Sequence, residues 1–340
     1  MKELIVYPNP LESQFVDSPI PEPGDDEVLI KVVVSGCNPK DWKYPAWQNK
    51  KFNSGDDIAG YIEKVGKNVF EFTKGDKVAA FHTMLTPYGS FAEYAISDAH
   101  TTFLLPESTS FEEAATIPLA SLTAVYALFS TLKLPTPWIP ATTEIPVFIN
   151  GGSTAVGAFA IQLLKLANVG PIICTAGSAA KVAEEYGADF VIDYRGKSPE
   201  QVGAEVRSHL KPGQSLFKAL DTVSENGSNM IMAAAVDNTP ESMVVMVLPK
   251  NNPTFYEAQL INFKQILVSM AHGEEAYNRD LAYVFMRQFS KWLAEGKFKG
   301  HPYVVVEDGL AGVGKSLQSM IEGKVSGFKY VYKIADTPGL

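Results

Sequence analysis

Residues 145–166, IPVFINGGSTAVGAFAIQLLKL, decide the fold of the second half of the chain. The apolar run that ends at Asn150 predicts a strand, and the apolar spacing after it predicts a helix. Between them, Gly152 and Gly157 occupy the first and last positions of a GxGxxG-type turn, with Thr154 in the middle. A helix that begins at such a turn offers free N–H groups and the positive end of its dipole to a phosphate. A plain glycine-rich turn is the alternative.

From about Ser121 onward, predicted strands alternate with predicted helices. This alternation is typical of βαβ units and predicts an α/β fold with a parallel, doubly wound sheet, which favours the nucleotide site over the plain turn. The expected strands after Asn150 are Ile172–Thr175, Phe190–Asp193, Leu216–Val223, Met243–Leu248 and Ile266–Met270, with helices near Ala179–Tyr186 and Glu200–Leu210.

The first part of the chain is β-rich, and we expect the tail to return to it. The β-branched run Val28–Val34 follows the turn-forming sequence PEPGDD, and turn clusters recur at short intervals, as in a small barrel or sandwich. After a long helix, about Arg279 to Glu295, strands reappear. The predicted domains are a discontinuous one, residues 1–122 and 296–340, and an inserted one, residues 123–295.

The composition excludes several classes of function. The net charge of −9 argues against nucleic acid or an anionic membrane as the main partner, because both require a basic surface. We find no signal peptide and no stretch with the roughly 18 apolar residues of a membrane span. Two cysteines, Cys37 and Cys174, are too few for a disulfide framework or a four-cysteine zinc lobe, which favours a reducing, cytoplasmic setting.

The end of the second predicted strand indicates which dinucleotide is preferred. An NAD site needs a carboxylate there to hold the ribose 2′-hydroxyl, but the sequence is CTAGSAAK. Ser178 and Lys181 stand where a 2′-phosphate would lie, and Tyr194 can cover the adenosine. The alternative is that Ser178 caps the next helix and Lys181 is a solvated surface lysine. NADPH is the favoured cofactor.

A known family matches over nearly the whole chain. The matching stretches are PEPGDDEVLIKV, GCNPKDWK, GDDIAGYIEKVGKNVFEFTKGDKVAAF, GSFAEYAI, AATIPLASLTAVYAL, GGSTAVG, GADFVIDYR and GKVSGFKYVYKI. The sequence resembles the medium-chain dehydrogenase/reductase superfamily in its zinc-independent, quinone reductase-like branch, and most of all fungal enoyl reductases that act in trans with polyketide synthases. The resemblance implies a GroES-like catalytic domain formed by both termini and an inserted Rossmann domain.

The resemblance also assigns cofactor contacts. Those beside the nicotinamide are Asn38, Pro39, Lys40 and Asp41, with Thr123 nearby. Those on the pyrophosphate are Gly152, Ser153, Thr154, Ala155, Val156 and Gly157. Those around the adenosine 2′-phosphate are Ser178, Ala179, Ala180, Lys181 and Tyr194. The contacts that complete the site are Leu248, Val325 and Ser326.

A metal is not expected. Zinc members of the superfamily use a cysteine three residues before the aspartate of the first loop, and a histidine beside the glycine of a GHE segment. Here these positions hold Asn38 and Asp56. Cys37 is one residue out of register, which in an extended segment aims its side chain the other way. We interpret it as a buried apolar thiol.

Without a metal, hydrogen-bond donors must polarise the carbonyl of the substrate. Lys43 and Tyr44, directly after the NPKD loop, are candidate proton donors, although such residues are commonly surface residues and solvent can supply the proton. Asn38 is interpreted as a residue that positions the nicotinamide, and Asp41 as a helix cap. The isolated histidines His82 and His272 receive no role.

The resemblance implies an NADPH-dependent reductase that transfers hydride to the activated C=C bond of an enone, enoyl thioester or quinone, in secondary-metabolite biosynthesis. The alternative is a catalytically silent NADPH-binding structural or interaction protein. The substrate is a small molecule or a carrier-bound enoyl group, with a polyketide synthase as possible partner. A free small substrate predicts aromatic lining from Tyr88, Phe255 or Phe263. Monomer and homodimer both stay open.

One motif indicates a different function. Gly309 to Ser316, GLAGVGKS, has the spacing of an ATPase phosphate loop and follows an apolar strand. A phosphate-loop fold needs several further strands and a magnesium-binding aspartate, and too little chain follows Ser316 to supply them. We interpret the motif as the start of a helix.

Overall fold

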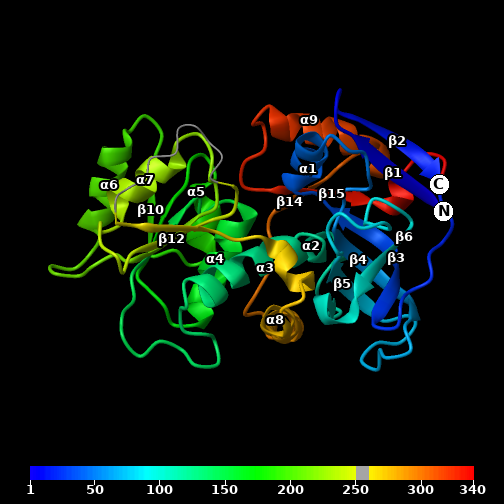
Figure 1. Ribbon diagram of the computed structural model, residues 1–340, viewed down its shortest axis with the longest axis horizontal. Helices are drawn as coiled ribbons and strands as arrows, with labels where there is room; N and C mark the ends of the chain where they lie inside the picture. The colour runs from blue at the N-terminus through cyan, green and yellow to red at the C-terminus, as the bar shows by residue number, and fades with distance from the viewer. Residues whose placement is uncertain (250–259) are drawn as a thin grey trace. The chain divides into compact units, whose positions relative to one another are not determined.

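The computed structural model describes residues 1–249 and 260–340, which form two compact units (Figure 1). The first unit contains Met1–Leu119 and Ser269–Leu340, and the second contains Ala120–Val268. The tail of the chain therefore returns to the first unit, as its mixed strands and helix predict.

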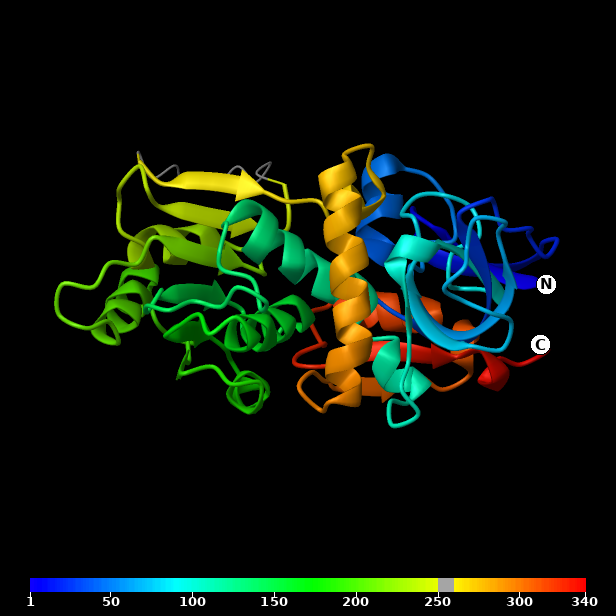
Figure 2. The same ribbon diagram turned by 90° about the horizontal axis from the view of Figure 1, so that it is seen from below.

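The long helix α8 (Ala276–Ala294) lies in the first unit, although the sequence analysis placed it in the inserted domain. α8, the orange helix of Figure 2, packs on the 3-10 helix η1 (Ala99–Thr101) and on β7 (Thr102–Leu104). The guanidinium of Arg287 donates to three backbone carbonyls of residues 99–102, at 2.9 to 3.3 Å. Contacts between segments so far apart in the chain leave no local pattern in the sequence.

The second unit is built on a six-stranded parallel sheet in the order β10-β9-β8-β11-β12-β13, which confirms the doubly wound fold. The order reverses between β8 and β11, and such sheets bind ligands at that point, outside the carboxyl ends of the strands. The strands are β8 (Val147–Asn150), β9 (Ile172–Thr175), β10 (Phe190–Ile192), β11 (Lys218–Asp221), β12 (Met243–Met246) and β13 (Asn262–Gln265). The helices between them are α4 (Ala155–Leu166), α5 (Ala180–Glu185), α6 (Pro199–Ser208) and α7 (Ser228–Ala235).

The central strands form because their side chains are apolar on both faces. Every residue of β8 and of β9 is buried. Phe148 of β8 packs in one cluster with Val206 of α6 and Met232 of α7. Each such side chain contributes about 1.5–3 kcal/mol when it leaves water.

The last strand differs from the prediction. The strand predicted at Ile266–Met270 is wrong, because the sixth strand is β13 and Val268–His272 forms the 3-10 helix η3. Phe263 is the one buried residue of β13, since the strand lies at the edge of the sheet. A polar edge strand lacks the apolar run by which buried parallel strands are recognised.

The first unit is built on a mainly antiparallel sheet in the order β14-β15-β3-β4-β5-β7, with β6 paired to β3 and a separate hairpin of β1 and β2. β15 pairs with β3, with Val331 opposite Gly36, so both ends of the chain share one sheet (Figure 1). The strands are β1 (Lys2–Tyr7), β2 (Glu12–Asp17), β3 (Glu27–Gly36), β4 (Asp57–Val65), β5 (Lys77–Phe81), β6 (Tyr94–Asp98), β14 (Tyr303–Val305) and β15 (Lys329–Lys333). The helices, besides α8, are α1 (Lys40–Gln48), α2 (Phe111–Ala114) and α9 (Val313–Ile321).

One helical run is more apolar than the sequence analysis expected. Phe111–Thr131, which includes α2 and α3 (Pro118–Val125), has a mean hydropathy of 1.4 and is long enough to cross a membrane. Within its apolar window, 89% is buried inside the protein. This burial is typical of a core helix.

A buried ion pair links β15 to β4. Lys329 donates to Asp57 Oδ2 at 2.6 Å, to Asn38 Oδ1 at 3.1 Å and to the carbonyl of Thr116 at 3.2 Å. The other oxygen of Asp57 accepts from the backbone N–H of Leu119 at 2.7 Å. Both charged side chains are buried. Each charge is therefore satisfied by protein groups.

We predict that Lys329→Met destabilises the protein by about 3–5 kcal/mol, because it leaves the buried Asp57 carboxylate unpaired. Adding Asp57→Asn to that variant should restore part of the loss. The control is Lys333→Met in the same strand, whose partly exposed pair with Glu112 contributes less than the buried pair. Denaturant unfolding measures all three variants. Equal stability of Lys329→Met and Lys333→Met would contradict the role of the pair.

Candidate cofactor and active site

The turn after β8 brings the end of that strand against the start of α4. Gly151 has φ +90°, in the left-handed region that favours glycine. A Cβ atom on Gly157 would lie 2.2 Å from the carbonyl oxygen of Gly151, and one on Gly152 would lie 2.5 Å from Cys174 Sγ. All three positions therefore require glycine. The sequence pattern identified the second and third of them and missed Gly151.

Thr154, in the middle position of the motif, is the N-cap of α4. Its Oγ1 accepts from the N–H of Gly157 at 3.0 Å and lies 2.9 Å from Thr222 Oγ1. The threonine thus replaces a glycine while it fixes the first turn of the helix. The side chains of Ser153, Ala155 and Val156 are small and partly exposed. A turn of this kind, with free N–H groups at a helix start, fits the pyrophosphate of a dinucleotide.

A row of polar side chains holds this turn in place. Asn150, Thr175 and Asp221 are the last residues of three neighbouring strands and lie in register. Thr175 Oγ1 donates to Asn150 Oδ1 at 2.6 Å, and Asn150 Nδ2 donates to Asp221 Oδ1 at 3.0 Å. Thr175 Oγ1 also accepts from the N–H of Gly151 at 2.9 Å. The sequence analysis missed this row, although a polar residue at the end of each apolar strand is its signal.

The residues predicted around the 2′-phosphate follow β9 and β10 at the same edge of the sheet. Ser178 and Lys181 are exposed and lie just after β9, with Ala179 and Ala180 between them. The N-cap position of α5 is Ala179, the residue directly after Ser178. Tyr194 follows β10 and is 45% exposed.

The remaining predicted contacts of the cofactor and substrate lie in both units. Leu248 follows β12 at the same sheet edge and is partly buried. Thr123 is buried in α3. Val325 and Ser326 belong to the loop before β15 in the first unit. Of the predicted aromatic lining, Phe263 is part of the core of the second unit, and Phe255 lies outside the described residues.

In the first unit, the Asn38 side chain is buried within the protein. Its Nδ2 donates to Asp57 Oδ2 at 2.8 Å, and its Oδ1 accepts from Lys329. The N–H of Asn38 donates to Asp41 Oδ2 at 2.8 Å, while the N-cap of α1 is Pro39. Asp41 therefore ties the first turn of α1 to the loop without being the N-cap itself.

Lys40 has an unexpected environment for a predicted cofactor contact. Its ammonium lies 3.0 Å from Asp41 Oδ1 and also contacts Asp56 and the carbonyl of Ser54, and its side chain is 12% exposed. Burial disfavours the charge of Lys40, but the attraction of the two carboxylates exceeds that penalty and raises the pKa of the ammonium. Lys40 acts as an internal counter-ion.

The carboxyl groups beside Lys40 have raised pKa values. Burial raises the pKa of Asp41 to about 7 and that of Asp56 to about 6, against the opposing attraction of Lys40. With Asp57, the three carboxyls face two ammonium groups, Lys40 and Lys329, so 3 − 2 leaves one negative charge in excess. A proton on one carboxyl cancels that charge.

The predicted proton donors are adjacent residues of α1. Lys43 is buried, with its ammonium 5.1 Å from the centre of the Trp42 ring. Tyr44 is half-buried and packs on Trp47, with the ring centres 5.4 Å apart. Burial raises the pKa of Tyr44, which keeps the phenol protonated at neutral pH. Both groups are N–H or O–H donors.

The residues at the zinc-ligand positions do not fit a metal. Asn38 bonds Asp57 and Lys329, and Asp56 is paired with Lys40. Among residues 1–249 and 260–340, no group of three or more His, Cys, Asp and Glu side chains is arranged to hold a metal ion. The Cys37 thiol is buried, and burial raises its pKa strongly, which keeps it protonated.

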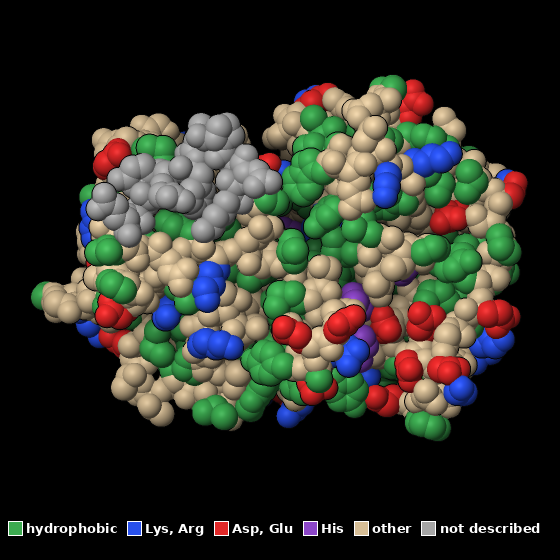
Figure 3. Space-filling view, viewed as in Figure 1, with side chains coloured by type: hydrophobic (Ala, Val, Ile, Leu, Met, Phe, Trp, Pro, Cys, Tyr) green, Lys and Arg blue, Asp and Glu red, His purple; other side chains and the backbone are tan. Residues whose placement is uncertain are grey.

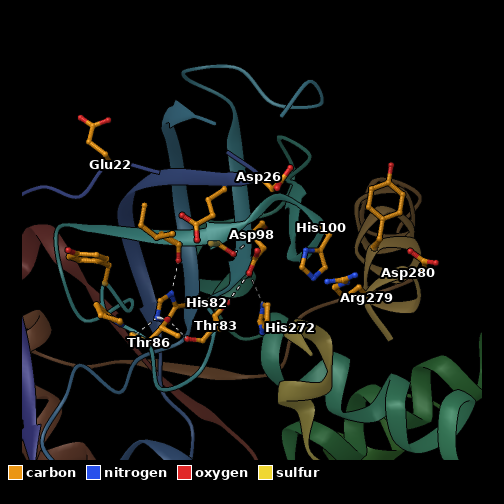
Figure 4. A pocket seen from close by; sticks show the side chains of 16 residues that line it. Glu22, Asp26, His82, Thr83, Thr86, Asp98, His100, His272, Arg279 and Asp280 are labelled. Carbon is orange, nitrogen blue, oxygen red and sulfur yellow. Dashed lines mark hydrogen bonds and ion pairs between the residues drawn. The ribbon is translucent and has the colours of Figure 1, made fainter. Parts of the chain in front are cut away.

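A cavity of about 810 Å³ lies in the first unit, and Figure 4 shows the side chains around it. His82 and His272 line it, and burial lowers the pKa of both, that of His272 to about 4, so both are neutral at pH 7. Asp98 accepts from Thr83 Oγ1 at 2.8 Å within it. Figure 3 shows carboxylates beside histidines on this face. The acidic lining is Glu22, Asp26, Glu27, Asp98 and Asp280, with Arg279 as its one arginine. Such a cavity disfavours phosphorylated ligands.

The phosphate-loop-like segment has a structural role. Gly309–Gly312 forms the 3-10 helix η4 ahead of α9, and the N–H of Leu310 donates to Thr337 Oγ1 at 2.9 Å. Ser316 Oγ donates to the carbonyl of Gly312 at 2.9 Å. The segment is the start of a helix and is covered by the C-terminal residues.

The proton held near Lys40 predicts a pH dependence of stability. Unfolded carboxyls have a pKa near 4, so the folded state binds more protons between about pH 4 and about pH 7. The stabilisation that comes from this extra proton binding is complete below that pH range, and it is lost as the pH rises through the range. Unfolding free energies should therefore fall more steeply from about pH 5 to about pH 8 in the native protein than in Asp41→Asn. Parallel curves for the two proteins would contradict the raised pKa.

Two family models match the chain. Residues 24–107 match the alcohol dehydrogenase GroES-like domain, and residues 155–285 match the zinc-binding dehydrogenase family. The first match falls in the first unit, and the second includes α4 and the strands β9 to β13.

Two relatives match almost all of the chain. Trans-enoyl reductase fsr4 of Gibberella fujikuroi is 39% identical over 314 residues, which cover 90% of this chain and 90% of that protein. Trans-enoyl reductase ACTTS2 of Alternaria alternata is 31% identical over 334 residues, or 95% and 96% of the two proteins. A mycobacterial protein solved in complex with NADPH has the same fold, with a TM-score of 0.75 at 22% identity over 97% of this chain and 99% of its own. The chain therefore belongs to the medium-chain dehydrogenase/reductase superfamily, together with the fungal trans-enoyl reductases.

Proposed function

We propose that this chain is an NADPH-dependent reductase that acts on the activated C=C bond of an enone, enoyl thioester or quinone. The observation that carries the proposal is the turn from Gly151 to Gly157 at the switch point of the sheet. No side chain larger than hydrogen fits at its three glycine positions. Such a turn lets a diphosphate approach the backbone of a helix start.

The preference for NADPH over NADH rests on charge at the end of β9. Residues 176–181 contain no carboxylate, and Lys181 is exposed there. A carboxylate would favour the ribose 2′-hydroxyl, whereas an ammonium favours a 2′-phosphate. The mycobacterial structure with NADPH is consistent with this choice.

The residues of the first unit are proposed to supply hydrogen bonds to the substrate. Bound NADPH supplies the hydride that reduces the β-carbon. The enolate oxygen that develops needs a donor, and the α-carbon needs a proton. Tyr44, whose phenol stays protonated, and Lys43 are the proposed donors. The loop Asn38–Asp41, fixed by Asp57 and Lys329, is the proposed support for the nicotinamide.

The relatives suggest the substrate class. Two of them are named trans-enoyl reductases, which favours an enoyl thioester on a carrier and a polyketide synthase as partner. A cytoplasmic location, and a monomeric or dimeric state, stay predictions. A catalytically silent NADPH-binding protein is the alternative function, and it shares the cofactor site but predicts no turnover of any acceptor.

We predict that Lys181→Ala weakens NADPH binding about tenfold to a hundredfold, because a hydrogen bond to a charged group contributes about 1.5–3 kcal/mol. The affinity for NADH should not change. Lys211→Ala, which removes an exposed lysine paired with Glu144, is the matched control. Fluorescence titration measures the dissociation constants of NADPH and of NADH for each variant. An equal loss for NADPH and NADH would contradict the assignment of Lys181 to the 2′-phosphate.

We predict that the native protein oxidises NADPH when given an enoyl pantetheine thioester, and that Tyr44→Phe lowers kcat about a hundredfold or more if its phenol is the general acid. The dissociation constant of NADPH should stay the same. Lys43→Met tests the second donor, and Tyr61→Phe on β4 is the control. Unchanged kcat in both Tyr44→Phe and Lys43→Met would contradict the two assignments. No turnover with thioesters, enones or quinones would favour the silent protein.

A further inference from the structure

The loop after β10 lies over the end of β9. The N–H of Ala176 donates to the carbonyl of Ile192 at 3.0 Å, which joins the two strand ends. A Cβ atom on Gly177 would lie 3.5 Å from the hydroxyl oxygen of Tyr194 and 3.6 Å from Cδ of Arg195. The side chain of Arg195 therefore lies beside Gly177, just after the second strand, in the region where the sequence analysis placed Ser178, Lys181 and Tyr194 around the 2′-phosphate.

Arg195 is held there by its neighbour Asp193. Its Nε donates to Asp193 Oδ1 at 3.0 Å and its Nη2 donates to Oδ2 at 2.7 Å, so the pair is bidentate. Both side chains are about half exposed, at 58% and 48%. Exposed ion pairs stabilise little, so the guanidinium is free to change partner. Two of its five N–H donors are used in this pair, and three stay available to a ligand.

We propose that Arg195 is a specificity-determining residue that binds the 2′-phosphate of NADPH, with Asp193 as its partner until the phosphate arrives. The inference rests on the proposed function and deepens it. A 2′-phosphate carries up to two negative charges and three acceptor oxygens, which a guanidinium binds in a bidentate manner. Without Arg195, the Asp193 carboxylate would repel that phosphate and favour the plain 2′-hydroxyl of NADH. Arg195 therefore offsets the negative charge of Asp193 at this end of the site.

The test uses the full chain and two nucleotide probes, 2′,5′-ADP and 5′-ADP, titrated by calorimetry. Arg195→Gln should weaken 2′,5′-ADP about tenfold to a hundredfold and leave 5′-ADP unchanged. Asp193→Asn should tighten 2′,5′-ADP a few-fold, since it removes a competing negative charge. The control is Lys197→Gln, which also removes one positive charge, two residues from Arg195. Lys197 pairs with Glu205, so this variant should bind both probes as the native protein does.

The outcomes separate this inference from the function on which it rests. If the native protein binds both probes and Arg195→Gln changes neither affinity, or no more than Lys197→Gln does, Arg195 is not a phosphate ligand. If Asp193→Asn weakens 2′,5′-ADP as much as Arg195→Gln, the ion pair shapes the site and the exchange of partners is overturned. If the native protein binds neither probe, the proposed dinucleotide site fails as well.

Discussion

The contact between the backbone of α4 and the end of β8 is the constraint on which the second unit depends. A Cβ atom on Gly157 would lie 2.2 Å from the carbonyl oxygen of Gly151, so the helix can begin this close to the strand only with glycine at both positions. The first N–H groups of α4 then point to the edge of the sheet where the strand order reverses. Asn150, Thr175 and Asp221 fix that edge by hydrogen bonds across three strands.

The first unit is organised around buried charge. Asp57 is balanced by Lys329, which comes from the C-terminal strand, and Asp41 and Asp56 are balanced by Lys40. Because removal of one partner leaves a charge buried without compensation, these pairs hold the loop before α1 in one conformation. The Lys40 ammonium occupies the space between two carboxylates, a place where a cation is required. Lys40, the residue directly before Asp41 in the sequence, supplies that cation.

The sequence predicted the architecture well where its signal is local. Apolar runs followed by helical spacing identified five of the six parallel strands, and the mixed pattern of the tail predicted its return to the first unit. β13 was missed because an edge strand needs few apolar side chains, and α8 was misassigned because Arg287 reaches carbonyls far away in the chain.

The candidate site was predictable to a similar extent. Two of the three glycines of the turn follow from their spacing in the sequence, whereas the partners of Lys40 depend on how the loop before β4 folds against α1. The position of Arg195 over Gly177 depends on the register between β9 and β10, which residue types do not determine. Contacts made through tertiary structure thus escaped the sequence analysis, and these include the ion pairs of Lys40 and Lys329 with the buried aspartates.

The central claim is that the turn beginning at Gly151 binds the diphosphate of a nicotinamide dinucleotide whose 2′-phosphate is selected by cations beyond β9. Equilibrium titration of the purified native protein with NADPH and with NADH, followed by cofactor fluorescence, tests it most directly. The account predicts saturable binding of both, with the tighter dissociation constant for NADPH. Absence of binding by either cofactor would contradict it.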